Sequence, residues 1–138
     1  MVVLDKLLLI IEDIVQKLDE LVNEGYDIND WRDQMAILHA LQVEAQAMID
    51  LCERLLSNMG ETSEGYKDSI KKLREKGILT SEEEKFLLSV IGFRNIVVHE
   101  YAEINFDFVE KILSRKDYKK ILEIAMKIKE RAKEYWDP

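Results

Sequence analysis

One eight-residue segment contains four side chains that we single out for their chemistry: Arg94, Asn95, His99 and Tyr101. His99 carries an imidazole, the side chain that most readily exchanges a proton near neutral pH. Arg94 keeps its positive charge and presents a planar set of N–H donors that matches a phosphate group. Asn95 lies four residues before His99, so on a helix its amide is suited to hold the imidazole or a phosphate. Such a set can move a proton beside a bound phosphate, where negative charge develops during transfer.

The same residues also admit a purely structural interpretation. Arg94 would pair with a carboxylate, His99 would be a hydrogen-bonded histidine at an interface, and Asn95 would support His99. A buried charge that has neither a partner nor a function costs several kcal/mol, so Arg94 requires one of the two explanations. The residue types alone leave both open.

The segment that leads into these residues is apolar on every side. From Phe86 to Val98 the sequence reads FLLSVIGFRNIVV, and Arg94 is its only charged residue. A helix with apolar groups around its whole circumference is covered on all sides. A chain of 138 residues can hardly surround one of its own helices, so we predict a symmetric homodimer in which a second copy covers part of this one. Gly92 shares a face with Asn95 and His99, and its missing side chain permits a backbone or a ligand to approach.

Helical periodicity over most of the remaining chain predicts an all-α fold, an antiparallel bundle of about five to six helices. No stretch of useful length alternates with the period of a strand. Residues 1–138 form a single domain, because no repeat or linker composition divides them. We expect helices over about 4–24, 30–58, 66–76, 80–100 and 106–113, and a last one that opens at 114–117.

Local signals and apolar stripes refine these helices. Thr80 and Glu83 have the spacing of a capping box, and Asn105 is placed to cap the helix that follows it. Tyr101 falls seven residues after Arg94, on the same helical stripe. Trp31 and Trp136 are expected to pack near helix ends, with stacking on a base as the alternative for either. The stripe of the last helix runs through Tyr118, Ile121, Ala125, Ile128, Ala132 and Tyr135.

Charge and cysteine content exclude several classes of protein. The 20 basic and 28 acidic side chains give a net charge of −8, which argues against a general nucleic-acid coat protein. Half of the acids lie in residues 1–64, whereas residues 106–138 are mildly basic. The single Cys52 forbids an internal disulfide and is expected to be a buried small hydrophobe. No targeting or membrane segment is recognisable, so we expect a cytoplasmic protein.

A metal site is not expected. A di-metal site in a helical bundle uses Glu-x-x-His pairs. The residues three before His39 and His99 are Ala36 and Ile96.

The segment Arg94-Asn95-Ile96-Val97-Val98-His99-Glu100-Tyr101 resembles the Arg-x4-His motif of the HEPN superfamily, in particular the HepT-like toxin branch, in which a Tyr follows two residues after the His. Three further segments are similar to that branch: Gly92-Phe93 just before the motif, Leu38-His39-Ala40-Leu41-Gln42, and the turn Gly77-Ile78-Leu79. The resemblance spans most of the chain and includes every residue of the motif.

The resemblance implies a metal-independent endoribonuclease toxin of a type VII-like toxin–antitoxin system. Arg94 and His99 of two subunits would form the catalytic site at the dimer interface, Asn95 would support them, and the product would be a 2′,3′-cyclic phosphate. The implied partners are an RNA substrate, a second copy of the chain, and an MntA-like nucleotidyltransferase antitoxin that inactivates the toxin by AMPylation of Tyr101. No cofactor, metal or membrane is implied.

An alternative of another class is a non-catalytic HEPN-like helical module that binds a nucleotide or serves as a scaffold for a nucleotidyltransferase. The enzyme hypothesis also suggests a track for the RNA backbone along a basic cluster, although such a cluster is more often a solvated helix face. The cluster comprises Arg115, Lys116, Lys119, Lys120, Lys127, Lys129, Arg131 and Lys133.

Overall fold

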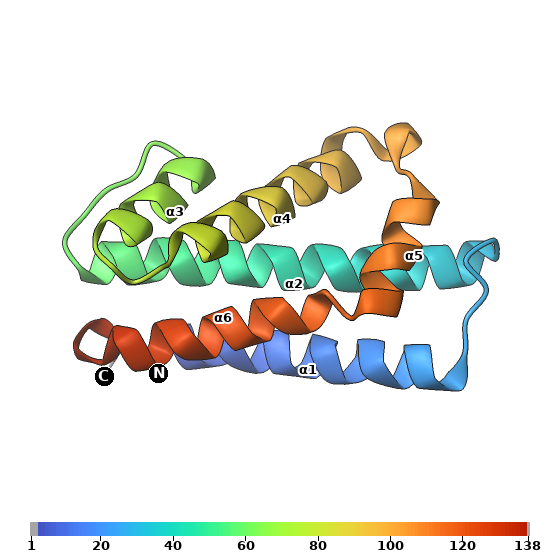
Figure 1. The fold of residues 1–138 in the computed structure, drawn as a ribbon, viewed down its shortest axis with the longest axis horizontal. Helices are drawn as coiled ribbons and strands as arrows, with labels where there is room; N and C mark the ends of the chain where they lie inside the picture. Colours follow the sequence, from blue (N-terminus) through green and yellow to red (C-terminus); the bar gives the residue numbers. More distant parts are fainter. Residues whose placement is uncertain (1–2, 138) are drawn as a thin grey trace.

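Residues 3–137, which the computed structural model describes, fold into six α-helices and two short 3₁₀ helices, with no strand among them (Figure 1). The α-helices are α1 (Val3–Glu24), α2 (Trp31–Asn58), α3 (Tyr66–Glu75), α4 (Ser81–His99), α5 (Phe106–Arg115) and α6 (Tyr118–Arg131), and the 3₁₀ helices are η1 (Tyr101–Glu103) and η2 (Lys133–Tyr135). The prediction of an all-α bundle is confirmed.

Three roughly parallel or antiparallel helices form the body of the molecule. Figure 1 shows α1, α2 and α6 running along the long axis, with α4 crossing α2 diagonally. The short α3 packs beside α2 and α4 at one end, and α5 stands across the long helices at the other. Within residues 3–137, no helix is long and apolar enough to cross a membrane.

The core is formed by the apolar stripes that face one another across these helices. Leu4, Ile11 and Leu18 of α1 are at most 1% exposed, and Leu51 and Leu55 of α2 are fully buried. Burial of each such side chain contributes about 1.5–3 kcal/mol. Cys52 is buried as predicted.

Side-chain caps fix where the helices begin. The Thr80 hydroxyl accepts a hydrogen bond from the Glu83 N–H (3.1 Å), and the Glu83 carboxylate accepts one from the Thr80 N–H (2.8 Å). This is the predicted capping box, and it opens α4. Glu83 also pairs with Arg131 of α6 (2.6 Å), so the start of α4 is tied to the last helix. Asn105 caps α5 as predicted, through the N–H groups of Asp107 and Phe108.

Two expectations about packing residues are wrong. Trp31 is 68% exposed, because it lies at the first position of α2, beyond the reach of the neighbouring helices. Tyr135 does not continue the stripe of α6, since α6 ends at Arg131 and Tyr135 lies in η2, where it is exposed. The other members of that stripe are buried, from Tyr118 to Ala132.

The two ends of the described chain are held against each other (Figure 1). The Leu4 N–H donates to the Asp137 carboxylate (2.8 Å), and the Trp136 indole N–H donates to Asp5 (2.8 Å). Asp137 also accepts from Arg54 and Asn58 of α2. The segment after α6 is therefore hydrogen-bonded to both α1 and α2.

Candidate functional site

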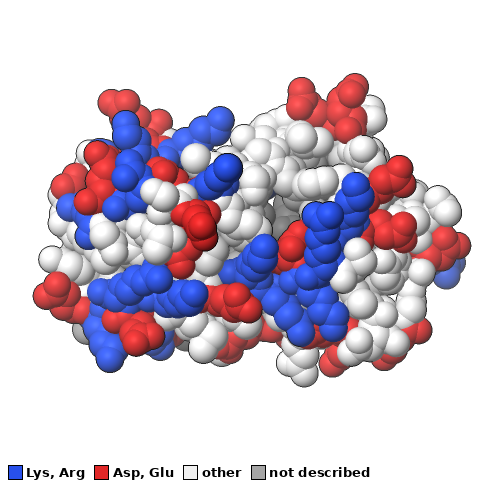
Figure 2. Space-filling view, in the orientation of Figure 1, with Lys and Arg blue, Asp and Glu red and all other residues white. Residues whose placement is uncertain are grey.

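The helix that carries the motif, α4, is only partly covered by its own chain. Leu87, Ile91 and Val97 are its only buried residues, and Val98 is 40% exposed. Figure 2 shows a largely uncharged surface over α4, between regions of mixed charge. An uncovered apolar helix of this kind is the surface that the predicted second copy would need.

Arg94 is held in place from three sides. Its Nε donates to the side-chain oxygen of Gln46 on α2 (3.0 Å), and one of its terminal nitrogens donates to the side-chain oxygen of Asn95 (2.9 Å). Its guanidinium carbon lies 5.4 Å from the centre of the Tyr66 ring at the start of α3, within the range of a cation–π contact. The side chain is thus oriented where α2, α3 and α4 meet.

All of these partners of Arg94 are electrically neutral. Arg94 makes no salt bridge with a carboxylate of residues 3–137. Gln46 itself is fixed by donating to Asp50, one turn further along α2 (2.8 Å). The structural interpretation, in which Arg94 pairs with a carboxylate, therefore does not hold within one chain. A partly buried guanidinium keeps its charge available for an anion.

Asn95 supports a different residue from the one expected. Its side-chain oxygen accepts the Arg94 hydrogen bond, and no hydrogen bond joins it to His99 in the described chain. Asn95 is therefore a positioning residue for Arg94. His99 is the last residue of α4, where its imidazole is exposed.

Arg94 and His99 of one chain point in different directions. Both lie in the regular part of α4, so five residues separate them by about 140° around the axis and about 7.5 Å along it. The Arg94 side chain turns toward α2, whereas the His99 imidazole faces solvent. For an Arg and a His to act on one phosphate, contributions from two chains are the simpler arrangement.

Tyr101 does not lie on the Arg94 stripe, so that expectation is wrong. The helix ends at His99, Glu100 adopts non-helical backbone angles (φ −133°, ψ 46°), and Tyr101 begins η1. Acidic residues at 100 and 103 disfavour continuation, because the C-terminal end of a helix carries partial negative charge. The Tyr101 side chain is 49% exposed, and its hydroxyl contacts the sulfur of Met35 on α2 (3.6 Å).

No contact within residues 3–137 requires glycine at position 92. A methyl group at this position would meet nothing within 4 Å. Gly92 lines a groove of about 400 Å³ between α4 and α5, together with Ile96 and Phe108. A need for glycine here would have to come from a molecule outside the chain, and a second α4 is one such molecule.

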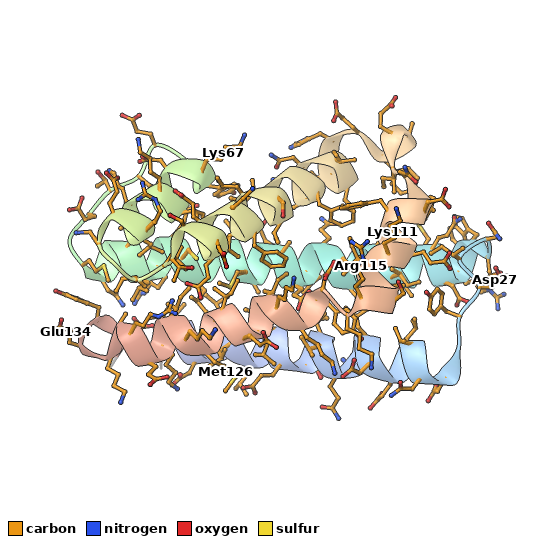
Figure 3. All side chains as sticks on the ribbon, in the orientation of Figure 1. Asp27, Lys67, Lys111, Arg115, Met126 and Glu134 are labelled. Atoms are coloured by element: carbon orange, nitrogen blue, oxygen red, sulfur yellow. The ribbon has the colours of Figure 1, made fainter. Side chains whose placement is uncertain are left out.

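The basic cluster of the last helices is largely occupied by ion pairs. Figure 3 shows Lys111 and Arg115 projecting from α5. Five of the eight cluster residues pair with carboxylates, which favours a structural role for the cluster over a track for the RNA backbone. These are Lys116 and Lys119 with Asp19, Lys120 with Asp117, Lys129 with Asp5, and Arg131 with Glu83.

Sequence reasoning missed Gln46, Tyr66 and Glu44. Gln46 and Tyr66 contact Arg94 across 48 and 28 positions of sequence, and no local spacing indicates such pairs. The sequence does indicate that Glu44 is unusual, because this charged residue type lies between Leu41 and Met48 on the apolar stripe of α2. It is fully buried in the structure.

Comparison with known proteins gives one family and several structural relatives. The family model described as "Ribonuclease HepT-like" matches residues 7–128, which is most of the chain. No curated protein sequence matches the chain.

Three solved structures illustrate the structural likeness. One is a tri-AMPylated HEPN toxin of Shewanella oneidensis in complex with an MNT antitoxin, with 21% identity and a TM-score of 0.78 over 88% of this chain and 95% of that chain. A toxin–antitoxin structure with AMP-PNP has 20% identity and a TM-score of 0.79 over 89% and 97%. The cytosolic protein YutE of Bacillus subtilis, of unknown function, has 15% identity and a TM-score of 0.80 over 98% and 92%. At these identities the three structures establish the fold.

Proposed function

Because the chain belongs to the HepT-like ribonuclease family, we propose that it is an endoribonuclease toxin whose active site combines Arg94 and His99 of two identical subunits. The observation that carries this proposal is the environment of Arg94. Its guanidinium is oriented by Gln46, Asn95 and Tyr66, and none of these neutralises its charge. Such a group is prepared to bind an anion that arrives from outside the chain.

The chemistry follows from the two side chains. Arg94 donates to the non-bridging oxygens of the scissile phosphate, where negative charge grows in the transition state. The His99 imidazole removes the proton of the ribose 2′-hydroxyl, and the 2′-oxygen attacks phosphorus. The bond from phosphorus to the 5′-oxygen breaks, and the second His99 of the dimer supplies a proton to that oxygen. The products are a 2′,3′-cyclic phosphate and a 5′-hydroxyl end, and no step uses a metal-bound water.

Dimerisation through α4 completes the site in this proposal. The face of α4 that carries Gly92, Asn95 and His99 is only partly covered by the described chain, with Gly92 and Asn95 partly buried and His99 exposed. A two-fold axis beside this face brings two copies of the motif together. A methyl group at Gly92 would meet no atom of the described residues within 4 Å, which leaves space for close approach of the second helix.

Control by a nucleotidyltransferase antitoxin is the second part of the proposal. The Tyr101 hydroxyl would attack the α-phosphate of ATP, form a phosphodiester with AMP, release pyrophosphate, and lose its proton to solvent. Tyr101 is half-exposed and lies two residues after His99. The added nucleotide brings a negative charge and bulk next to the catalytic imidazole, which would exclude RNA. The structural relative from Shewanella oneidensis, an AMPylated toxin with an MNT antitoxin, supports this assignment by analogy.

The decisive experiment compares the wild-type protein with His99→Ala. Each is expressed without an antitoxin, and each purified protein is incubated with RNA in EDTA. We expect growth arrest and RNA ends with a cyclic phosphate from the wild type, and neither from the variant. Equal toxicity of the two proteins, or cleavage that EDTA abolishes, would contradict the proposal. If purified wild type never cuts RNA and His99→Ala still binds the nucleotidyltransferase, the chain is a non-catalytic helical module.

A further inference from the structure

Glu44 is a carboxyl group in the interior that has no partner. It is 0% exposed, and neither of its side-chain oxygens forms a hydrogen bond with any group of residues 3–137. Burial raises its pKa from 4.5 to about 9, so the group is protonated at neutral pH. An unpaired buried carboxyl costs free energy compared with a leucine of similar size, and the Arg94 and His99 chemistry does not use it.

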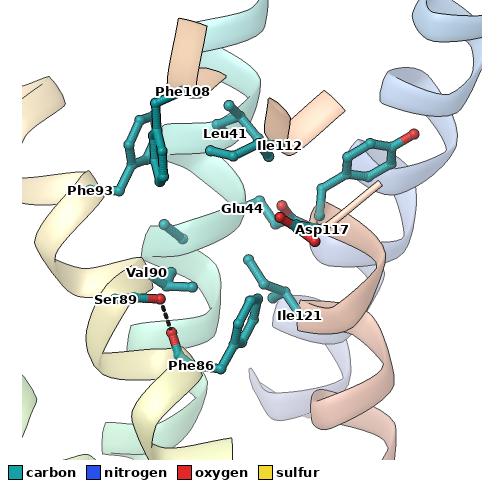
Figure 4. A pocket seen from close by; sticks show the side chains of 12 residues that line it. Leu41, Glu44, Phe86, Ser89, Val90, Phe93, Phe108, Ile112, Asp117 and Ile121 are labelled. Carbon is teal, nitrogen blue, oxygen red and sulfur yellow. Dashed lines mark hydrogen bonds between the residues drawn. The ribbon is translucent and has the colours of Figure 1, made fainter. Parts of the chain in front are cut away.

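Glu44 lines a cavity of about 90 Å³ that opens between α2, α4, α5 and α6. Figure 4 shows it between Phe86 and Phe93 of α4 on one side and Asp117 at the start of α6 on the other. The remaining wall is almost entirely apolar, made of Leu41, Ala45, Val90, Phe108, Ile112, Tyr118 and Ile121. Apolar and aromatic walls around one polar group are typical of a site for a small organic molecule, and a volume of about 90 Å³, well below that of a drug-sized pocket, limits the occupant to about one ring.

The other polar groups in the wall already have partners. The Ser89 hydroxyl donates to the Phe86 carbonyl (2.6 Å), and the Tyr118 hydroxyl donates to Asp19, away from the cavity. Asp117 lies 3.9 Å from the ammonium of Lys120. Glu44 is therefore the one polar side chain in this wall, within the described chain, that is left without a partner.

The cavity is separate from the Arg94 site. Glu44 and Gln46 are two positions apart on α2, so their side chains leave the helix about 200° apart. Gln46 contacts Arg94, whereas Glu44 faces the cavity. A ligand bound at Glu44 does not compete for the groups assigned to RNA cleavage, and the inference stands whether or not the proposed function is correct.

A protonated carboxyl presents one O–H donor and one carbonyl acceptor side by side. An alcohol or a simple amine satisfies one of them. A planar heterocycle with a ring nitrogen next to an amino group satisfies both at once, and its faces suit the rings of Phe86, Phe93 and Phe108. We propose that this cavity binds a small aromatic heterocycle with such an amidine-type edge, which pairs with Glu44 through two hydrogen bonds. A free heterocycle and a nucleobase share this edge.

The test uses 2-aminopyridine against 2-methylpyridine, which has the same shape and ring nitrogen but lacks the amino donor. Binding to isotope-labelled protein is followed by NMR. We expect 2-aminopyridine to shift amide signals of the residues around the cavity and to bind at least tenfold more tightly than 2-methylpyridine. Equal affinities, or no shift with either compound, would overturn the proposal and leave a cavity that holds about three waters at ~30 Å³ each.

Two variants at position 44 distinguish binding through paired hydrogen bonds from simple filling of the cavity. Glu44→Gln keeps an adjacent donor and acceptor, so it should retain the tenfold preference. Glu44→Leu removes both, so the preference should be lost while the protein stays folded. A preference that survives in Glu44→Leu also contradicts the proposal. Adenine distinguishes the source of the edge: binding comparable to 2-aminopyridine indicates a nucleobase, and discrimination against adenine indicates a smaller heterocycle.

Discussion

The guanidinium of Arg94 on α4 and the amide of Gln46 on α2 are joined by a hydrogen bond of 3.0 Å, although 48 positions separate them in sequence. Gln46 in turn donates to Asp50. The carboxylate thus reaches Arg94 only through a neutral amide, which orients the guanidinium and leaves its charge in place. This relationship connects the packing of α4 on α2 with the phosphate binding that we propose for Arg94.

Substitution of Gln46 tests that relationship. Gln46→Ala removes one hydrogen bond to a charged group, for which about 1.5–3 kcal/mol is typical, so RNA cleavage should fall about tenfold or more. Gln46→Glu places a carboxylate beside Arg94 and should reduce cleavage further, because an ion pair competes with the phosphate. The same substitution loses the hydrogen bond that Gln46 donates to Asp50 and places two carboxylates one turn apart on α2, so its melting temperature should be unchanged or lower. Wild-type cleavage by Gln46→Glu would show that Arg94 does not bind phosphate.

Gly92→Ala distinguishes a free α4 from one that packs on a second copy. In an isolated chain the new methyl meets nothing, and replacement of a helix-interior glycine should stabilise the fold by about 0.5–1 kcal/mol. In the proposed dimer the same methyl lies between two helices and should weaken association. Sedimentation and urea unfolding, measured on the same samples, report the two effects separately. A more stable protein with unchanged dimerisation would place the interface elsewhere.

Glu44 should make stability fall as the solution becomes more alkaline. Its pKa rises on folding from 4.5 to about 9, so its contribution is fully present below pH 4.5 and is lost progressively as pH rises toward 9. Between pH 6 and pH 8.5 the free energy of unfolding should decrease by about 3 kcal/mol. Glu44→Gln should lack this decrease. Asp117 lines the same cavity, and Asp117→Asn is the matched control that should retain it.

Tyr118 anchors the start of α6 on α1. Its ring is buried, and its hydroxyl donates to Asp19, which lowers the pKa of that carboxyl. Tyr118→Phe keeps the packed ring and removes one hydrogen bond to a charged acceptor, so unfolding should become easier by about 1.5–3 kcal/mol. Asp19 also pairs with Lys119 (3.0 Å), and Lys119→Ala should cost less because this ion pair is partly exposed to solvent. Urea denaturation of both variants at pH 7 checks the order.

Features set by neighbours in sequence were predictable. The capping box of Thr80 and Glu83 depends on a spacing of three residues, and the structure contains it. Arg94 stood out because a charge interrupts an apolar helix. Two of its three partners did not stand out, since Gln46 and Tyr66 reach Arg94 only after three helices have packed, whereas Asn95 is its neighbour in sequence. The free energy that orients Arg94 therefore belongs to tertiary structure.

Errors in the sequence interpretation arose at helix ends. Tyr101 and Tyr135 both continue a helical spacing, yet each falls after the backbone has left the α-helix. A periodic pattern of residue types can continue past the end of a helix. The helix itself ends where its last carbonyl groups are capped or exposed to solvent. Trp31, at the first position of α2, is exposed for a related reason, because terminal positions of a helix lie beyond the neighbouring helices.

Asp5 and Asp137 hold the first turn of α1 and the segment after α6 together through Trp136 and the Leu4 N–H. The backbone positions at the two ends of the described chain therefore lie close together, so a short linker can span them. A circular permutant that joins the old ends by a short linker and opens in the loop between α2 and α3 should form the same bundle. In such a permutant, α1 and η2 become interior segments, and the motif of α4 lies close to the new beginning.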